Sequence, residues 1–269
     1  MKYTGISAIL ALAASANAFV LPGAETKATS TQLNGLSPGV VSKTGGWEIE
    51  KISPRVRIEG QSRHTFSMQD ASKEIVQIAM RSPNARPVNA DVELWIGPDW
   101  TPVKVNCHSE DGSKHPLQTL VGTRNKNANV ELLNTGNHAF PIDAACSYAI
   151  SPLTEDRETI KEEEGIYIEG GAIKMSPIPS NVEQLQVLIE TEGKMLNAMI
   201  ELLNGPNNVK VEYEIFTNNG QLNSLFVVFE TPEDGNAIRI RNLAPMEFPC
   251  KFYVKPTKFG SNDMAPQWN

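Results

Sequence analysis

The sequence predicts a mainly β fold, in the mainly β or α+β class, built from two tandem pseudo-repeat units. Short runs of alternating apolar and polar residues recur along the chain between glycines, prolines and asparagines. That pattern is typical of half-buried strands joined by turns. The chain also matches itself twice, and self-similarity of this kind determines the architecture. We expect each unit to be a sheet or sandwich of about five to six strands with one helix, the two units related by a pseudo-twofold axis.

The first self-match places residues 64–95 over residues 185–216, a shift of 121 positions. Asp70 then falls on Thr191, and both residue types can cap a helix. Ile75, Ile78 and Ala79 follow Asp70 at helical spacing. We therefore predict a helix over residues 70–81 and its counterpart over residues 191–204.

The second self-match has a shift of 108, and it places residues 130–134 over residues 238–242. Each run ends in asparagine and is followed, after five residues, by Phe-Pro. Asparagine starts a turn, and Phe-Pro fixes an extended exit with a buried ring, so we interpret this match as structural. Residues 166–170 also match residues 56–60 at a shift of 110. The residues that define the repeat are then Asp70, Asn134, Phe140, Pro141, Thr191, Asn242, Phe248 and Pro249.

The remaining elements are predicted to be strands. In unit 1 they cover residues 47–52, 56–60, 64–68, 88–96, 103–107, 117–121, 130–133 and 146–150. In unit 2 they cover residues 166–170, 185–189, 209–217, 225–230, 238–241 and 250–254. Alternation over residues 88–96 puts Trp95 on the polar face, with Phe216 as its counterpart at the shift of 121. Such aromatic bulk indicates either a contact surface or a face covered by a second layer, and both remain open.

The chain divides by composition into six segments. An apolar stretch ends at Ala16 and Ala18, an A-x-A cleavage pattern, and residues 19–44 hold seven Ser or Thr residues and one acid. We expect a signal peptide over 1–18, a plastid transit peptide over 19–44, unit 1 over 45–152, an acidic linker over 153–165, unit 2 over 166–256 and a tail over 257–269. Plain secretion is the alternative address.

No motif in the sequence proposes a reaction. The net charge is −7 without a basic cluster, which argues against nucleic-acid binding. The three cysteines contain no CxxC pair and lie in apolar strands, so we expect buried hydrophobes rather than disulfides or zinc ligands. The four histidines are scattered, no phosphate-binding or nucleophile motif occurs, and no apolar run reaches the ~18 residues of a membrane span. We predict no catalytic residue, metal or cofactor, and interpret Glu93 and Glu214 as a solvated strand face.

Three features of the chain occur together: Ala18-Phe19 in the leader, the duplicated β-rich body, and the run Val56-Arg57-Ile58-Glu59-Gly60 leading into Ser62-Arg63-His64-Thr65-Phe66. In these features the chain resembles the diatom pyrenoid shell (PyShell) proteins. The resemblance implies a non-enzymatic protein of the plastid stroma that assembles with itself into a sheet around the Rubisco matrix and limits CO2 leakage. The Rubisco matrix and related shell proteins are the other partners that it implies.

Aromatic residues are the candidate assembly contacts, because aromatic side chains often anchor protein interfaces. They are Trp95, Trp100, Phe216, Phe259 and Trp268. Two other classes of function remain open: a plastid or secreted β-sandwich binding module without catalytic activity, and a plastid enzyme of unrecognised type.

Overall fold

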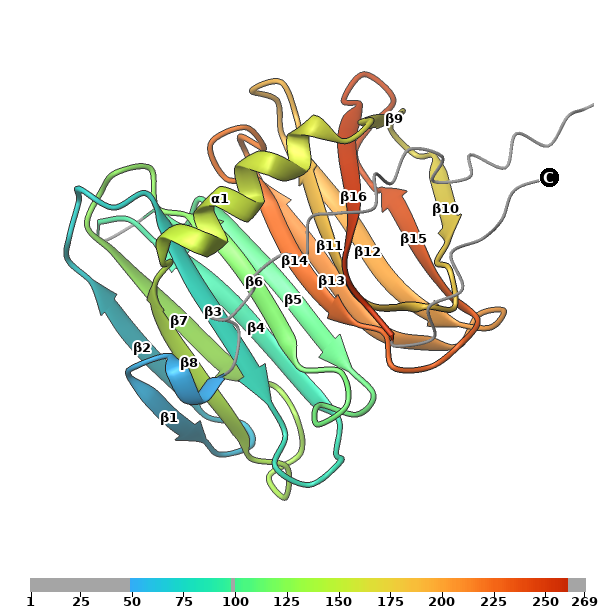
Figure 1. The fold of residues 1–269 in the computed structure, drawn as a ribbon. Helices are drawn as coiled ribbons and strands as arrows, with labels where there is room; N and C mark the ends of the chain where they lie inside the picture. The colour runs from blue at the N-terminus through green and yellow to red at the C-terminus, as the bar shows by residue number, and fades with distance from the viewer. Residues whose placement is uncertain (1–48, 98–99, 261–269) are drawn as a thin grey trace, which may run out of the picture. The chain divides into compact units, whose positions relative to one another are not determined.

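A computed structural model describes residues 49–97 and 100–260 of the chain. All of them belong to one compact unit, Gln32–Asn269. The expected signal peptide, transit peptide and Trp268 lie outside the described residues. The described chain forms two antiparallel sheets of eight strands each and one α-helix (Figure 1). The mainly β prediction is therefore confirmed.

The first sheet, sheet A, contains the following strands in spatial order: β1 (Arg55–Ile58), β8 (Ile142–Tyr148), β3 (Ile75–Arg81), β6 (Leu117–Gly122), β14 (Leu225–Glu230), β11 (Val182–Glu190), β16 (Cys250–Phe259) and β9 (Ile166–Ile168). Sheet B contains β10 (Ile173–Pro177), β15 (Asn236–Asn242), β12 (Leu196–Asn204), β13 (Val209–Thr217), β5 (Val103–Ser109), β4 (Val88–Trp95), β7 (Ala128–Asn134) and β2 (Arg63–Met68).

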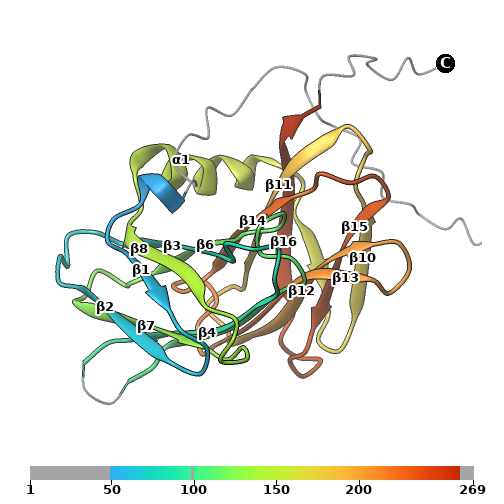
Figure 2. The ribbon, with the colours of Figure 1, turned by 90° about the horizontal axis from the view of Figure 1, so that it is seen from below.

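The two sheets pack face to face as two layers (Figure 2). One continuous apolar core lies between them, and both sheets contribute fully buried side chains to it, such as Ile78 and Val187 from sheet A and Val105 and Ile200 from sheet B. In β4, buried and half-buried residues alternate along the whole strand, as predicted for residues 88–96. Sheet B therefore buries one face and leaves the other toward solvent, as antiparallel sheets commonly do.

Sheet A is covered on its outer face as well. The helix α1 (Ser151–Thr159) and the 3-10 turn η2 (Ile160–Glu162) cross that face (Figure 1). Leu153 and Ile160 are fully buried there against Leu188 and Phe226. The segment predicted as an acidic linker thus contains two buried apolar residues, Leu153 and Ile160, that cover the sheet. A second 3-10 turn, η1 (Ile49–Lys51), replaces the strand predicted over residues 47–52 and packs on two alanines of β3 and β8.

Both predicted helices are wrong, because their sequences form strands. The segment 75–81 is β3, buried along nearly its whole length, and residues 196–204 form β12. A strand that is covered on both faces needs no alternation, so its apolar residues can fall at helical spacing by coincidence. Asp70 caps a tight turn instead, accepting bonds from the amide and hydroxyl of Ser72. Thr191 is buried and donates its hydroxyl hydrogen to the carbonyl of Lys194, at 2.6 Å.

The strand order is the same in the two halves of the chain, β1–β8 and β9–β16. Each half places its strands in the order 1-8-3-6 in sheet A and 2-7-4-5 in sheet B, counted from its own first strand. This arrangement is that of a jelly roll with eight strands, more than the five to six predicted. The halves join through β5 with β13 and through β6 with β14.

The register at this junction is reciprocal. Val103 lies opposite Thr217, and Val211 lies opposite Ser109. Adding 108 to 103 and 109 gives 211 and 217, so equivalent residues exchange partners across the junction. The same exchange occurs between β6 and β14, where Gln118 faces Val228 and Leu120 faces Phe226. Reciprocal contacts are what a twofold axis produces, so the register is compatible with two tandem units related by a pseudo-twofold axis.

The shift of 121 positions is wrong, for a topological reason. It places β2 over β11 and β3 over β12, although the members of each pair lie in different sheets. The shifts of 108 and 110 instead bring β7 over β15 and β1 over β9, which hold corresponding places. Trp95 and Phe216 are consequently not counterparts.

Candidate functional site

The described residues contain no group of three or more His, Cys, Asp or Glu side chains that could hold a metal ion. All three cysteines are free and buried, as predicted. Burial raises the pKa of Cys250 to about 12 and raises the pKa of Cys107 and Cys146 as well. These thiols therefore stay protonated, unlike the thiolates that act as nucleophiles.

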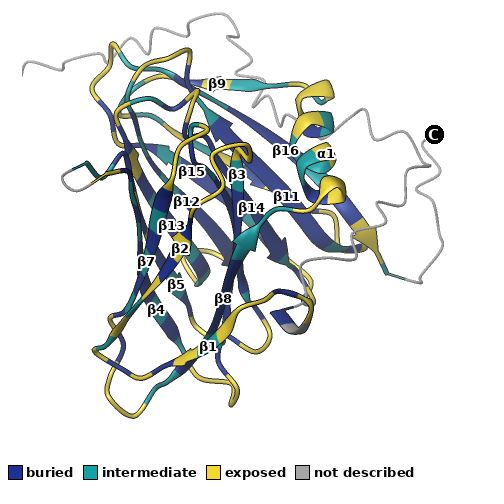
Figure 3. Cartoon of the chain, turned by 90° about the vertical axis from the view of Figure 1, so that its left-hand side faces the viewer, coloured by how far each residue is buried: buried dark blue, intermediate teal, exposed yellow. Residues whose placement is uncertain are grey.

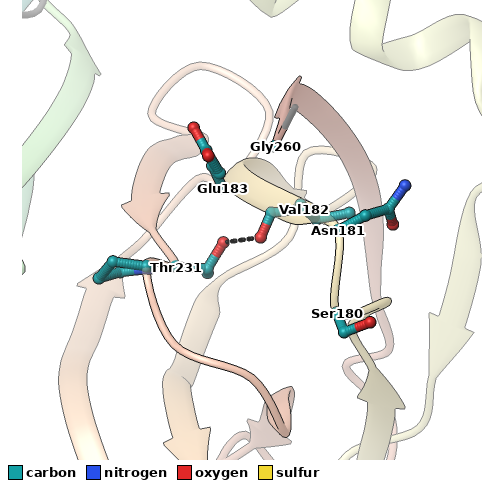
Figure 4. Close-up of a pocket in the computed structure, with 7 residues that line it drawn as sticks. Ser180, Asn181, Val182, Glu183, Thr231 and Gly260 are labelled. Carbon is teal, nitrogen blue, oxygen red and sulfur yellow. Dashed lines mark hydrogen bonds between the residues drawn. The ribbon is translucent and has the colours of Figure 1, made fainter. Parts of the chain in front are cut away.

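A hollow lies at the start of β11, beside the last residues of β16 (Figure 4). Its walls are mainly backbone and small polar side chains, and its carboxylate, Glu183, forms an ion pair of 2.7 Å with Lys258. The Thr231 hydroxyl donates to the Val182 carbonyl at its base. Thr123 makes the corresponding bond to Lys73 in the first half. The hollow thus follows from the strand geometry and presents no reactive constellation.

In the middle strands of sheet B, the solvent-facing side carries paired polar and charged side chains beside the exposed Phe216. Lys104 binds Glu93 at 2.7 Å, and Asn106 donates to Glu214 at 3.3 Å. Glu201 is the most buried carboxylate of this face, and the guanidinium groups of Arg239 and Arg241 bind it at 2.5 and 3.0 Å. Glu93 and Glu214 lie on strands that flank β5 and share no described cleft, in line with the solvated-face interpretation.

The repeated asparagines hold equivalent turns. Asn134 is fully buried, donates to the carbonyls of Ile58 and Phe140, and accepts from the amide of Gly136. Asn242 does the same with Ile168, Phe248 and Ala244. The donor distances are 3.1 and 2.9 Å in both halves. Each asparagine therefore ties the end of its own strand to the edge strand of sheet A and to the Phe-Pro exit.

The Phe-Pro exits are less buried than predicted. Phe140 and Phe248 are both half-buried, and the guanidinium of Arg86 lies 5.0 Å from the ring centre of Phe140. Pro141 and Pro249 lead directly toward β8 and β16. Two glycines fit against these turns: a Cβ on Gly60 would lie 2.0 Å from the Asn137 carbonyl oxygen. On Gly170 it would lie 1.8 Å from that of Pro245.

The candidate aromatic contacts do not form one surface. Trp95 is half-buried on β4, with its indole N–H buried and without a hydrogen-bond partner among the described residues. Trp100 is half-buried under the guanidinium of Arg124, 4.8 Å from the ring centre. Phe216 is exposed on β13, and Phe259 is exposed at the end of β16, which runs past the predicted end of unit 2 at residue 256.

A different apolar feature was missed by the sequence analysis. Ile173, Met175 and Leu243 are exposed at the edge of sheet B formed by β10. The sequence does contain a signal for this feature. At the shift of 110, β2 carries polar residues at the positions that correspond to Ile173 and Met175. None of the described helices is long and apolar enough to cross a membrane.

Likenesses to solved structures are weak. A deletion mutant of the Bacillus subtilis oxalate decarboxylase matches with a TM-score of 0.21 and 8% identity, over 76% of this chain and 68% of that chain. Vicilin from Solanum lycopersicum matches with a TM-score of 0.18 and 8% identity, over 74% and 75%. TM-scores this low do not show a shared fold, and no curated protein matches the chain.

Family comparison gives a specific result. The model of the family described as diatom pyrenoid shell protein matches residues 47–256, which is most of the chain and all of the two-sheet body except the last three residues of β16. The chain belongs to the diatom pyrenoid shell protein family.

Proposed function

We propose that this protein assembles with copies of itself into a sheet that encases the Rubisco matrix of the pyrenoid and supports CO2 concentration. The observation that carries the proposal is the family match over residues 47–256. The family indicates a structural role in the pyrenoid of the plastid, and the buried, protonated thiols agree with a protein that performs no thiol chemistry.

The architecture supports assembly because both sheets are open. Among the residues that the structure describes, β1 and β9 end sheet A, and β10 and β2 end sheet B, so each edge strand has one side without a described strand partner. β1 and β2 lie at one end of the two sheets and β9 and β10 at the other (Figure 1). Figure 3 views the molecule from the end that carries β1 and β2, where β1 and its loops are exposed. Open edges can pair with another chain. Because the two ends of one chain differ, a contact made at one end leaves the other end available for a further contact, so an array can grow.

The proposal includes the plastid-targeting leader and the boundaries of the repeat units. The leader over residues 1–44 would direct the chain to the plastid stroma, with cleavage after Ala18 and again near residue 44. The body would then comprise the two repeat units on either side of residues 153–165. Trp95, Trp100, Phe216, Phe259 and Trp268 remain candidate contacts between copies, and the Rubisco matrix or related shell proteins remain candidate neighbours.

Imaging of the protein in diatom cells tests this function. The full chain carries a fluorescent protein at its C-terminus, and a second label marks Rubisco. We expect a closed ring around the Rubisco body. Diffuse stromal fluorescence would contradict the shell role, and fluorescence in the secretory route would contradict the address. A matched chain with Phe19→Ala tests the leader separately, since it should lose plastid import while its body is unchanged.

A further inference from the structure

Three large apolar side chains lie together on the solvent-facing side of β10 and the residue that follows β15. Ile173, Met175 and Leu243 are 61%, 52% and 41% exposed. Ile173 pairs with Arg241 in the β10–β15 ladder, so Leu243, two residues further along, is its diagonal neighbour on the same face. We call these three residues the apolar strip. Ile173 and Met175 lie on β10, the outermost strand of sheet B, and Leu243 follows the neighbouring strand β15.

The fold itself does not require this strip. At the corresponding positions of the first half, β2 carries Arg63 and Thr65, and Thr135 follows β7. β2 and β10 have the same sequence of exposed and buried residues over their first five positions. The first half thus fills the same exposed places with polar side chains, and Arg63 binds Glu131 at 3.0 Å. Exposed apolar side chains on one edge only indicate a contact surface.

The backbone of β10 also favours a contact at this edge. The amide of Asn242 donates to the carbonyl of Ala172, and that of Ile178 donates to the carbonyl of Asn236. In an antiparallel ladder alternate residues face the partner strand, so these bonds turn the even-numbered residues toward β15. The N–H and C=O groups of Ile173 and Met175 therefore face away from the sheet, where another strand could bind them.

We propose that this edge pairs with the same edge of a second copy, β10 against β10, about a twofold axis. An antiparallel pair of this kind continues sheet B into the neighbour and brings two identical apolar strips together. The halves of the chain already join in this manner, through reciprocal pairing of β5 with β13 and of β6 with β14. The inference deepens the proposed function, on which it rests, by naming one contact of the assembly.

Charge favours this arrangement over a head-to-tail one, in which β10 of one copy would pair with β2 of the next. Pairing β10 with β2 of a neighbour would set Arg63 against Ile173 and Met175, and the third outward residue of β10 is Pro177. None of these side chains can accept a hydrogen bond, so the guanidinium would lose the water around it and gain no partner beyond Glu131. In the twofold arrangement, apolar side chains meet apolar side chains.

Cysteine cross-linking of the full chain tests the geometry. The native cysteines are buried, so a cysteine introduced on an edge strand is the reactive one. Ile173→Cys and Met175→Cys are oxidised separately, with Arg63→Cys and Thr65→Cys as matched controls at the corresponding positions of β2. We expect a covalent dimer with at least one β10 variant alone and none with either β2 variant. A dimer that requires mixing a β10 variant with a β2 variant, or no dimer in any sample, would overturn the proposal.

A double substitution in the apolar strip tests how much these side chains contribute to the affinity of the dimer. The double variant Ile173→Arg/Met175→Thr carries the residues that the first half tolerates at the same positions, so it should keep its fold, as checked by its melting temperature. We expect its dimer dissociation constant, from sedimentation equilibrium, to rise about 100-fold. Arg63→Ala/Thr65→Ala is the control and should leave the constant unchanged. An unchanged constant in the swap variant would sink the idea.

Electron microscopy of the same samples separates the two claims. Sheets from wild-type protein without β10 self-cross-links would leave the shell function standing and refute this edge contact. Self-cross-linked dimers without any larger assembly would leave the contact standing and refute the shell function.

Discussion

Asn134 and Asn242 show how one side chain can specify a connection between strands of different sheets. Each lies at the end of a sheet B strand and is bonded to a carbonyl on an edge strand of sheet A, to the carbonyl of a phenylalanine and to a turn amide. The sequence revealed the asparagine and its spacing to Phe-Pro. It could not reveal the third partner, Ile58 or Ile168, because that contact joins residues more than 70 positions apart.

Replacing Asn134 with alanine should destabilise the protein by about 2–4 kcal/mol, since two buried carbonyls and one amide lose their partner. Asn242→Ala should cost a similar amount because its bonds are the same. The control is Asn129→Ala, a half-buried position on the outer side of sheet B, which should stay within about 0.5 kcal/mol. Denaturant unfolding measures all three, and equal costs for Asn129→Ala and Asn134→Ala would contradict this role of the turn.

The elements show where sequence periodicity fails. In β3, Ile75, Ile78 and Ala79 have the spacing of a helical face, yet they belong to a central strand of sheet A. The strand is buried on both sides because the core lies beneath it and η1 packs on Ala79 from outside. β4, which faces solvent on one side, alternates clearly and was predicted correctly. Whether a strand alternates depends on whether another segment covers the outer face of its sheet. The covering segments are distant in the sequence, so the local pattern does not reveal them.

Glu230, at the end of β14, gives the sheet a pH dependence. Burial raises its pKa above 4.5, although Gln184 donates a hydrogen bond to it. The folded state binds the proton of the Glu230 carboxyl more tightly than the unfolded state does. The contribution of Glu230 to stability is therefore fully present below pH 4.5. That contribution is lost as the pH rises through the folded pKa. We expect Glu230→Gln to raise the melting temperature at pH 8 by roughly 1–3 °C.

This gain should disappear as the pH falls below 4.5, where both states of the wild type hold the proton. The control Glu183→Gln removes an exposed ion pair with Lys258 and should change the melting temperature little at either pH. A gain for Glu230→Gln of the same size at pH 4 and pH 8 would show that burial of its charge is not the cause.

At the scale of the whole molecule, the class of fold and the family followed from the sequence, whereas the candidate contact did not. The exposed residues Ile173 and Met175 are unremarkable in isolation, because single apolar residues are common on protein surfaces. They become informative beside Arg63 and Thr65, and that comparison needs the shift of 110 that the strand order supports. The shift of 121 hid it by placing β2 over β11.

We propose that this chain builds an extended array from two open-edged halves. Electron microscopy of the purified full chain, over a series of increasing concentrations, tests this assembly. We expect sheets or tubes one molecule thick, with a repeat that contains pairs of chains joined at β10. A monodisperse monomer at the highest concentration would contradict it.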